Sequence, residues 1–218
     1  MHLFHLRMED CEPELRKLAT LLPSKKRCAV DIGANFGHYS IELSKYFSSV
    51  IAFEINDALT HDLSRFSKKI RVVNIGLSSS AGAATLYIPL HNGNFPLVGW
   101  ASLALGNCPD ADTYLEKAVR IAPLDSFEIA ELDFMKIDVE GHELEVLRGA
   151  RKTLEMNSPT LLIEIKRENV KAVSGYLREI GYEMLNKQSL IGGSNNENFL
   201  FVKKSEQAGP GNGAPRRV

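Results

Sequence analysis

The sequence predicts an α/β protein in which helices cover both faces of a mostly parallel, twisted sheet, with an antiparallel strand at its C-terminal end. Short apolar segments alternate with amphipathic segments of about 10–15 residues, a pattern typical of parallel strands joined by helical crossovers. The last two apolar segments are separated by the turn sequence Gly-Gly-Ser-Asn-Asn at residues 192–196, which favours antiparallel pairing.

The first part of the chain repeats a unit of strand, turn and helix. A covering helix is expected over residues 13–22, within an N-terminal segment of residues 1–27, because leucines recur there at helical spacing. Apolar, β-branched runs then predict buried strands, each of the first two followed by a turn and an amphipathic helix. The predicted strands cover residues 28–33, 48–55 and 71–78, and the two helices begin near residues 37 and 57.

A different pattern interrupts this repeat over residues 83–122. Two strand-like runs there flank a long loop rich in Asn, Gly and Pro, which predicts a hairpin-like insertion. Its loop carries Phe95, Trp100 and Tyr114 and is expected to form a lid, although a small hydrophobic cluster is an equally simple interpretation.

The parallel pattern then resumes and completes one domain over residues 1–205. The tail, residues 206–218, is rich in glycine and proline and is expected to be disordered. The remaining predicted strands cover residues 133–141, 160–165, 182–188 and 198–204, and the predicted helices cover residues 142–156 and 169–180.

Composition excludes several classes of function. The 218 residues carry a formal net charge of -1, so the chain lacks the basic excess that attracts nucleic acid. No apolar run reaches about 18 residues, which argues against an integral membrane protein. The three cysteines show no C-x-x-C spacing, and residues 1–10 lack the apolar run of a secretory signal, so we expect a cytoplasmic protein with no metal site.

A glycine-rich turn follows the first buried strand, in the motif VDIGANFGHYS over residues 30–40. Gly33 and Gly37 permit positive φ angles and let a ligand approach the backbone. The amides at the start of the next helix suit an anionic group, either a phosphate or the carboxylate of an amino-acid-like cofactor. Asp31 is then placed for the ammonium group of such a cofactor. A turn that only joins strand to helix is the alternative.

Two residues indicate which cofactor this turn favours. A dinucleotide motif requires G-x-G-x-x-G, and Asn35 replaces its second glycine, so a pyrophosphate fits less well. Glu54 ends the second strand about 20 residues after the turn, where an acid can bind ribose hydroxyls. Together they predict an adenosine-containing ligand, the alternative being that Glu54 caps the surface.

Further polar residues follow the later strands. Asn74 could border an adenine ring, or equally tie down its own turn. Asp138, Glu140 and His142 follow the fourth parallel strand, which a doubly wound sheet brings beside the glycine turn, and Glu164 ends the next strand. Asp138 is therefore expected at the cofactor, Glu140 and His142 at a hydroxyl that loses its proton, and Glu164 at the acceptor. Their alternative roles are to orient the loop and to begin the following helix.

These motifs, taken in order, resemble the FkbM family of methyltransferases, a branch of the class I S-adenosylmethionine-dependent enzymes. The resemblance rests on VDIGANFGHYS, VIAFEI, VVNIGLSS, IAPLDSF, DFMKIDVEGHELEVLRGARKTL and LLIEI, between residues 28 and 166. It implies a Rossmann-like fold and S-adenosyl-L-methionine as cofactor. The implied reaction is O-methylation of a hydroxyl on a small-molecule or glycan acceptor, such as a sugar or natural product.

The resemblance also implies roles for individual residues. The methionine part of the cofactor is expected at Asp31, Gly33, Asn35 and Gly37, and the ribose at Glu54. The adenine is expected near the turn after the third strand.

Two other functions share much of this pattern. A nicotinamide-dependent oxidoreductase would have the same sheet, glycine turn and ribose-binding acid, although Asn35 disfavours it. A binding module without catalytic activity could keep the cofactor fold, because fold alone does not establish activity. The sequence does not indicate an oligomeric state.

Overall fold

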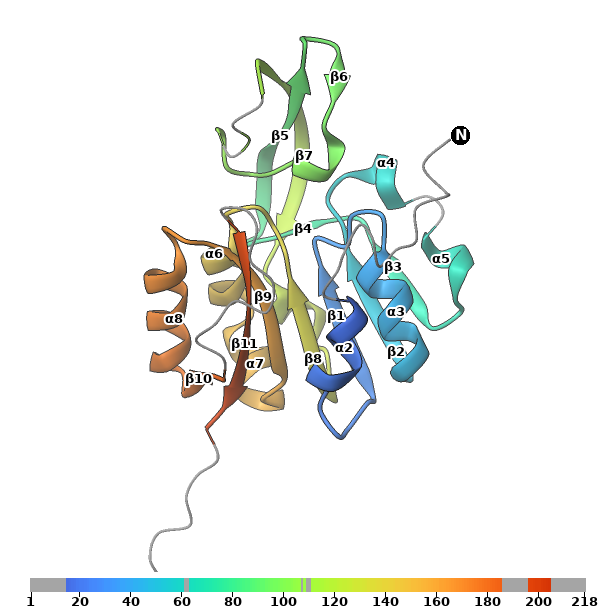
Figure 1. The fold of residues 1–218 in the computed structure, drawn as a ribbon, viewed down its shortest axis with the longest axis vertical. Helices are drawn as coiled ribbons and strands as arrows, with labels where there is room; N and C mark the ends of the chain where they lie inside the picture. The colour runs from blue at the N-terminus through green and yellow to red at the C-terminus, as the bar shows by residue number, and fades with distance from the viewer. Residues whose placement is uncertain (1–14, 61–62, 107, 109–110, 186–195, 205–218) are drawn as a thin grey trace, which may run out of the picture.

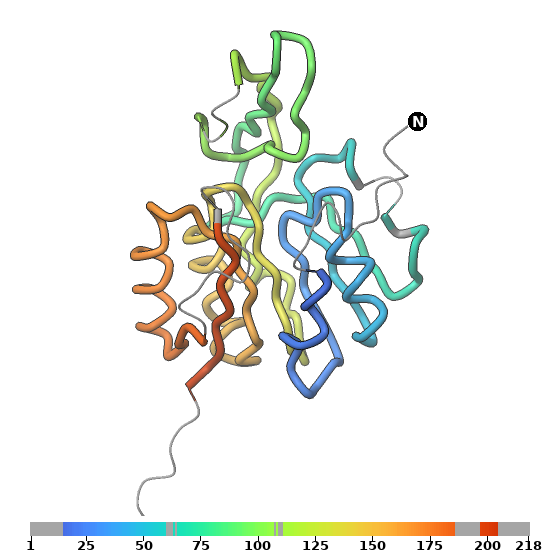
Figure 2. The backbone as a smooth tube through the Cα atoms, in the orientation of Figure 1, coloured from blue at the N-terminus to red at the C-terminus, as the bar shows by residue number. Residues whose placement is uncertain are grey.

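A seven-stranded sheet forms the centre of the computed structural model, which describes residues 15–60, 63–106, 108, 111–185 and 196–204 (Figures 1 and 2). The strand order is β3-β2-β1-β8-β9-β11-β10. Neighbouring strands from β3 to β9 are parallel, whereas β11 is antiparallel to both β9 and β10. The strands are β1 (Cys28–Ile32), β2 (Ser49–Phe53), β3 (Ile70–Val73), β8 (Leu132–Ile137), β9 (Thr160–Lys166), β10 (Tyr182–Met184) and β11 (Asn196–Lys203).

This order confirms the predicted fold class. The final two strands pair antiparallel as expected, and β11 lies inside the sheet, which leaves β10 at the edge. Chain order reverses between β1 and β8, so the loops that follow these two strands meet at the carboxyl edge.

Helices cover both faces of the sheet, and each face has its own hydrophobic core. One core contains Leu18 and Leu43 against Phe134, and the other contains Leu147 and Leu177 against Ile137. Alternate residues along a strand face opposite sides, so the central strands are apolar on both. The helices are α2 (Leu15–Leu21), α3 (His38–Tyr46), α4 (Asp57–Thr60), α5 (Leu63–Phe66), α6 (Glu143–Gly149), α7 (Arg151–Asn157) and α8 (Val170–Glu179).

A long hairpin stands above the carboxyl edge of the sheet (Figure 1). Its strands, β5 (Gly82–His91) and β7 (Thr113–Ala122), pair antiparallel. With β4 (Gly76–Leu77) and β6 (Phe95–Pro96) they form a second sheet in the order β4-β7-β5-β6.

The predicted strand over residues 71–78 is wrong in its extent, because the chain there changes sheets. β3 ends at Val73, and β4 pairs with β7 of the hairpin. Asn74 lies at the break, and its Nδ2 donates to the carbonyl oxygens of Glu54 at 2.8 Å and Ile55 at 3.2 Å. The side chain thus fixes the position where the chain leaves the main sheet.

The predicted helix over residues 142–156 is likewise two helices, α6 and α7. Ala150 separates them with φ −106° and ψ 4°. The carboxylate of Asp125 accepts hydrogen bonds from the backbone amides of Lys152 at 3.0 Å and Thr153 at 2.8 Å. This cap satisfies the first amides of α7, so a separate helix begins there.

Two further expectations concern other segments. The helix predicted after residue 57 contains α4 and α5, with residues 61–62 between them outside the described part. The tail, residues 206–218, lies entirely outside it. Within the described residues, none of the helices combines the length and the apolar character needed to cross a bilayer.

Candidate functional site

A pocket of about 360 Å³ lies at the carboxyl edge of the sheet, below the hairpin. Its floor and walls come from the loops after β1, β2, β3 and β8 and from Glu164 near the end of β9, and the segment 98–103 of the insertion forms its roof. The residues that line it and were predicted from the sequence are Gly33, Asn35, Glu54, Asp138, Glu140, His142 and Glu164.

The loop after β1 contacts the loop after β8 at Gly33. Its φ is +76°, and a Cβ built on it would lie only 1.7 Å from the carbonyl oxygen of Asp138. The amide of Asp138 also donates to the carbonyl oxygen of Ile32 at 2.9 Å. The glycine is therefore required for contact between the two loops, a constraint that the sequence analysis had assigned to a ligand.

Asn35 and Glu54 form the wall on the β1 and β2 side. Asn35 has a left-handed backbone, with φ 50°, and its amide donates to Oε2 of Glu54 at 2.7 Å. The amide of Asn56 donates to Oε1 at 2.7 Å. Burial raises the pKa of Glu54, and these two hydrogen bonds oppose that rise by favouring the charged form. The carboxyl group is thus held in one orientation at the pocket wall.

One polar atom of this wall lacks a hydrogen-bond partner. The Nδ2 of Asn35 donates to the carbonyl oxygen of Gly99 at 3.5 Å, but its buried Oδ1 accepts no hydrogen bond. A buried acceptor without a partner is costly and uncommon in native proteins. Asn35 itself is one of the residues that line the pocket.

Three predicted cofactor residues lie outside the pocket lining. Asp31 is 1% exposed, and its Oδ2 accepts a hydrogen bond from Ser40 Oγ at 2.5 Å. Gly37 is the N-cap residue that precedes α3, with φ 83°, and a Cβ there would lie 1.9 Å from Leu63 Cδ1. Asn74 donates hydrogen bonds to the backbone of Glu54 and Ile55, so it stabilises its own turn, which was the other role considered for it. These three support the site from behind.

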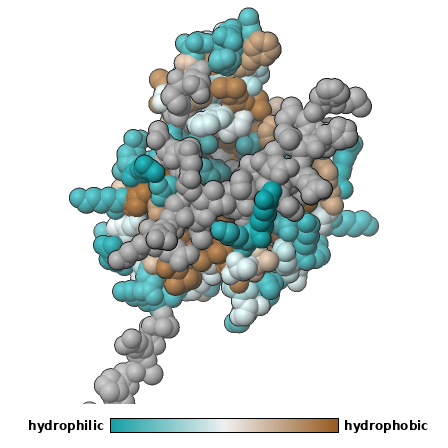
Figure 3. All heavy atoms as spheres, in the orientation of Figure 1, coloured by the Kyte–Doolittle hydropathy of each residue, from teal (hydrophilic) through white to brown (hydrophobic). Residues whose placement is uncertain are grey.

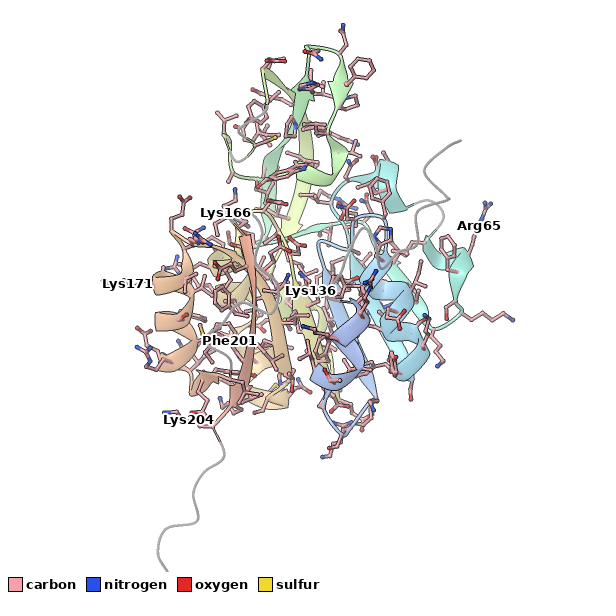
Figure 4. The ribbon with its side chains drawn as sticks, in the orientation of Figure 1. Arg65, Lys136, Lys166, Lys171, Phe201 and Lys204 are labelled. Carbon is pink, nitrogen blue, oxygen red and sulfur yellow. The ribbon has the colours of Figure 1, made fainter. Side chains whose placement is uncertain are left out.

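Lys136 connects two acids of the pocket and was missed by the sequence analysis. Its ammonium lies 3.3 Å from Asp138 Oδ2, 3.8 Å from Glu164 Oε2 and 4.9 Å from the ring centroid of Tyr39. The side chain is only 1% exposed, in the middle of the sheet (Figure 4). A lone lysine within the apolar run of β8, two residues before Asp138, was the signal that could have identified it.

His142 lies beside Ser78 at the pocket. Its Nε2 is 3.0 Å from Ser78 Oγ, and Ser78 is 6% exposed. Burial lowers the pKa of His142, whereas the charge of Glu145 acts in the opposite direction. The imidazole is therefore neutral at pH 7 and can accept a proton. Ser78, which the sequence analysis did not single out, orients the ring.

The roof contacts both loops beneath it. Besides the hydrogen bond between Asn35 and Gly99, the Oγ of Ser102 donates to the carbonyl oxygen of Glu140 at 3.0 Å. Trp100 lines the pocket and is 40% exposed, whereas Phe95 and Tyr114 do not line it. Brown, apolar side chains are visible on the hairpin in Figure 3. Of the three predicted lid aromatics, Trp100 is therefore the one at the site.

The charge of the lining is one-sided. The pocket has four carboxylates and neither lysine nor arginine among its lining residues, all of which are described. Within the described part of the chain, no three His, Cys, Asp or Glu side chains are grouped as a metal site would require. The arrangement suits a ligand that carries positive charge or hydroxyl donors.

Comparisons with known proteins identify the family of the chain. The model of the Methyltransferase FkbM domain matches residues 31–184. Hexuronic acid methyltransferase AglP of Haloferax volcanii is 30% identical over 157 residues, which cover 68% of this chain and 61% of that protein. The match therefore spans less than two thirds of the length of this relative.

Solved structures show the same fold. The crystal structure of methyltransferase FkbM from Methylobacillus flagellatus aligns with a TM-score of 0.57 and 18% identity, covering 81% of this chain and 43% of that one. A ribosomal protein L11 methylase from Lactobacillus delbrueckii aligns with a TM-score of 0.54 and 11% identity, covering 88% and 79%. Class I methyltransferases thus share this fold, and the sequence match over residues 31–184 shows that the chain belongs to the FkbM methyltransferase family.

Proposed function

We propose that this chain is an S-adenosyl-L-methionine-dependent methyltransferase that methylates a hydroxyl of a sugar, glycan or natural-product acceptor. The observation that carries the proposal is the pocket itself. Its wall combines the buried Glu54 carboxyl with the partnerless Oδ1 of Asn35, on the side of the sheet where β1 and β2 end.

The residues present fit the proposed cofactor. Ribose hydroxyls and an ammonium group are hydrogen-bond donors, and Glu54 and Asn35 offer acceptors to them. The sulfonium is a cation, and a lining with four carboxylates and no lysine or arginine favours it electrostatically. When bound, the cofactor supplies an electrophilic methyl group.

The opposite end of the pocket is proposed for the acceptor. Glu164 lies near the end of β9, and β9 is three strands away from β2, or about 14 Å at the usual strand spacing. Asp138 and Glu140 lie between them, after β8, and Trp100 lines the same pocket from the roof. In this proposal residues 1–205 act as one catalytic domain, with the insertion at residues 83–122 closing the acceptor side.

The chain's own residues then contribute in two ways. The pocket walls align the acceptor and exclude water, an effect that can supply much of the rate enhancement of a two-substrate reaction. The acceptor hydroxyl must also lose its proton. The neutral imidazole of His142, oriented by Ser78, and the carboxylate of Glu140 are the groups proposed to receive it.

The curated relative supports a sugar-like acceptor. Its name describes a hexuronic acid methyltransferase. The match covers 61% of that protein, and the acceptor in its name is a sugar acid.

Calorimetric titration followed by a turnover assay tests the proposal. The purified protein is titrated with S-adenosylmethionine, S-adenosylhomocysteine and NAD, and S-adenosylhomocysteine release is then measured on a panel of hydroxylated acceptors. We expect binding of the first two ligands, no binding of NAD, and release with at least one acceptor. Binding of NAD alone, or cofactor binding without turnover of any acceptor, would contradict the proposal.

A further inference from the structure

We infer that Glu143 is a positioning residue, which holds the turn of residues 140–142 so that Glu140 and His142 face the acceptor. The inference rests on the proposed function, because these two side chains are the groups proposed to receive the proton of the acceptor hydroxyl. Glu143 itself does not line the pocket, so it acts on the reaction only through the turn.

The turn that carries the two groups has an unusual backbone. Glu140 has φ 53° and Gly141 has φ 103°, so two consecutive residues have a positive φ. This conformation is unfavourable for a residue that carries a side chain, so surrounding contacts must hold Glu140 in it. The contacts of the turn therefore decide where Glu140 and His142 lie in the pocket.

Glu143 makes one of these contacts from inside the protein. Its Oε1 accepts a hydrogen bond from the backbone amide of Gly141 at 2.7 Å, in the middle of the turn. Glu143 is the first residue of α6 and follows the N-cap residue His142, so its carboxyl group reaches back out of the helix. An acid in the first turn of a helix commonly stabilises only the helix, through the partial positive charge there. The hydrogen bond to Gly141 gives Glu143 a second role.

The burial of Glu143 is unfavourable for stability. The residue is 2% exposed, and its Oε2 has no hydrogen-bond partner among the described residues. Burial and the charge of Asp138 raise its pKa, whereas the charge of Lys166, whose ammonium lies near Gly141, acts in the opposite direction. An apolar side chain would avoid the burial of a carboxyl group. Such local conflicts with stability are expected mainly at functional sites.

Two other contacts hold the ends of the turn. The Oγ of Ser102, in the roof, donates to the carbonyl oxygen of Glu140 at 3.0 Å. The Oγ of Ser78 lies 3.0 Å from Nε2 of His142. Neither of these contacts reaches the middle of the turn, where the first acid of α6 binds the amide of Gly141. Loss of that acid should let the middle of the turn move and shift the groups on either side of it.

The loss of this contact should affect catalysis more than cofactor binding. A group that accepts a proton must lie within hydrogen-bond distance of the acceptor hydroxyl, and a displacement of about 1 Å can lower the rate by about 10²-fold. The proposed cofactor end, at Asn35 and Glu54, lies after β1 and β2 and is held by its own hydrogen bond. We therefore expect kcat to fall while the Kd of S-adenosylhomocysteine changes little.

Three variants of the whole protein test the inference. Glu143→Leu removes both the charge and the oxygen that accepts the Gly141 amide. Glu143→Gln removes the charge but keeps an oxygen at the same reach, and Glu143→Asp keeps the charge but shortens the reach. The measurements are kcat and KM with the acceptor that the panel above turns over best, and the Kd of S-adenosylhomocysteine by calorimetry.

The expected order of activity follows the position of the oxygen. Glu143→Leu should lower kcat by at least about tenfold with less than about a threefold change in Kd, and Glu143→Gln should restore kcat to within about threefold of the wild-type value. Glu143→Asp should have a kcat at least about threefold below that of Glu143→Gln. Glu179→Leu, which replaces an exposed acid at the end of α8, is the control and should leave both kcat and Kd unchanged.

A kcat of Glu143→Leu equal to that of the wild-type protein would overturn the inference. A Glu143→Gln variant less active than Glu143→Asp would also overturn it, because the charge and not the hydrogen bond to Gly141 would then be required. This second comparison does not depend on whether Glu143→Leu folds.

The outcomes separate this inference from the function on which it rests. Turnover by the wild-type protein together with full kcat in Glu143→Leu would overturn the inference and leave the proposed function intact. A wild-type protein that binds no S-adenosylmethionine, or that turns over no acceptor, would overturn the proposed function, and the inference with it.

Discussion

The carbonyl oxygen of Asp138 occupies the space that a side chain on Gly33 would need. A Cβ at Gly33 would lie 1.7 Å from that oxygen, and the glycine has φ +76°. The loops after β1 and β8 can approach each other only because this position has no side chain. The geometry of the pocket floor depends on this contact.

Gly33→Ala should therefore destabilise the fold as well as the site. A left-handed backbone and a clash with a backbone atom together should cost about 3 kcal/mol or more. Thermal unfolding should show a Tm lower by about 6–12 °C. Gly82→Ala is the control, since a Cβ there would have no atom within 4 Å, and its Tm should change little. An equal change of Tm in the two variants would contradict the conclusion that the two loops need a glycine at position 33.

Lys136 should be needed for the stability of the acidic wall. Lys136→Met leaves Asp138 and Glu164 without the ammonium that lies between them, and breaking a buried ion pair commonly costs about 3–5 kcal/mol. The value here should lie at the lower end, because the two acids are 26% and 20% exposed. Urea denaturation measures the loss.

Adding Asp138→Asn to Lys136→Met should restore part of that stability, since it removes one of the two carboxylates that lose the ammonium. If the double variant is no more stable than Lys136→Met alone, the ammonium does not act by balancing these acids.

The stability of the protein should depend on pH because Glu143 is buried. It is 2% exposed, its Oε2 has no hydrogen-bond partner, and burial raises its pKa. Because the pKa of Glu143 is higher in the folded than in the unfolded protein, its contribution to the free energy of unfolding is fully present below the unfolded pKa of about 4.3. That contribution is lost as pH rises through the folded-state pKa.

Glu143→Gln has no charge to bury and keeps an oxygen for the amide of Gly141. Its Tm should exceed that of the wild-type protein at pH 8, and the difference should vanish near pH 4. Glu179→Gln, exposed on α8, should show no such trend. A Glu143→Gln difference independent of pH would exclude burial of the charge as the cause.

If His142 accepts the proton of the acceptor hydroxyl, its pKa should set the pH dependence of catalysis. Because burial lowers its pKa, the acid limb of kcat/KM should have its midpoint below pH 6.5. His142→Gln should remove that limb and lower kcat by about 10²-fold with little change in KM. His91→Gln, exposed on the hairpin, is the control. If the His142→Gln variant keeps the acid limb of the kcat/KM profile, another group accepts the proton, and Glu140 is the next to test.

The sequence was informative wherever local pattern and topology agreed. The strand and helix periodicities identified the parallel sheet, and the doubly wound order correctly placed Asp138 beside Gly33. Seven predicted residues line one pocket because parallel strands present their carboxyl ends at one edge. These features follow from the order of strands along the chain.

Other features depended on contacts that periodicity does not encode. The break at Ala150 comes from Asp125, a cap supplied 25 residues earlier in the chain. The sheet change after β3 comes from pairing with the distant β7. The role of Lys136 depends on side chains of β9 and α3 that approach it only in the folded protein.

A crystal structure of the protein with S-adenosylhomocysteine tests the central claim most directly. We expect the ribose hydroxyls at Glu54, a donor of the ligand at Asn35 Oδ1, and the sulfur facing the loop of Asp138 and Glu140. A ligand bound outside this pocket, or bound in it with Glu54 and Asn35 untouched, would contradict the account.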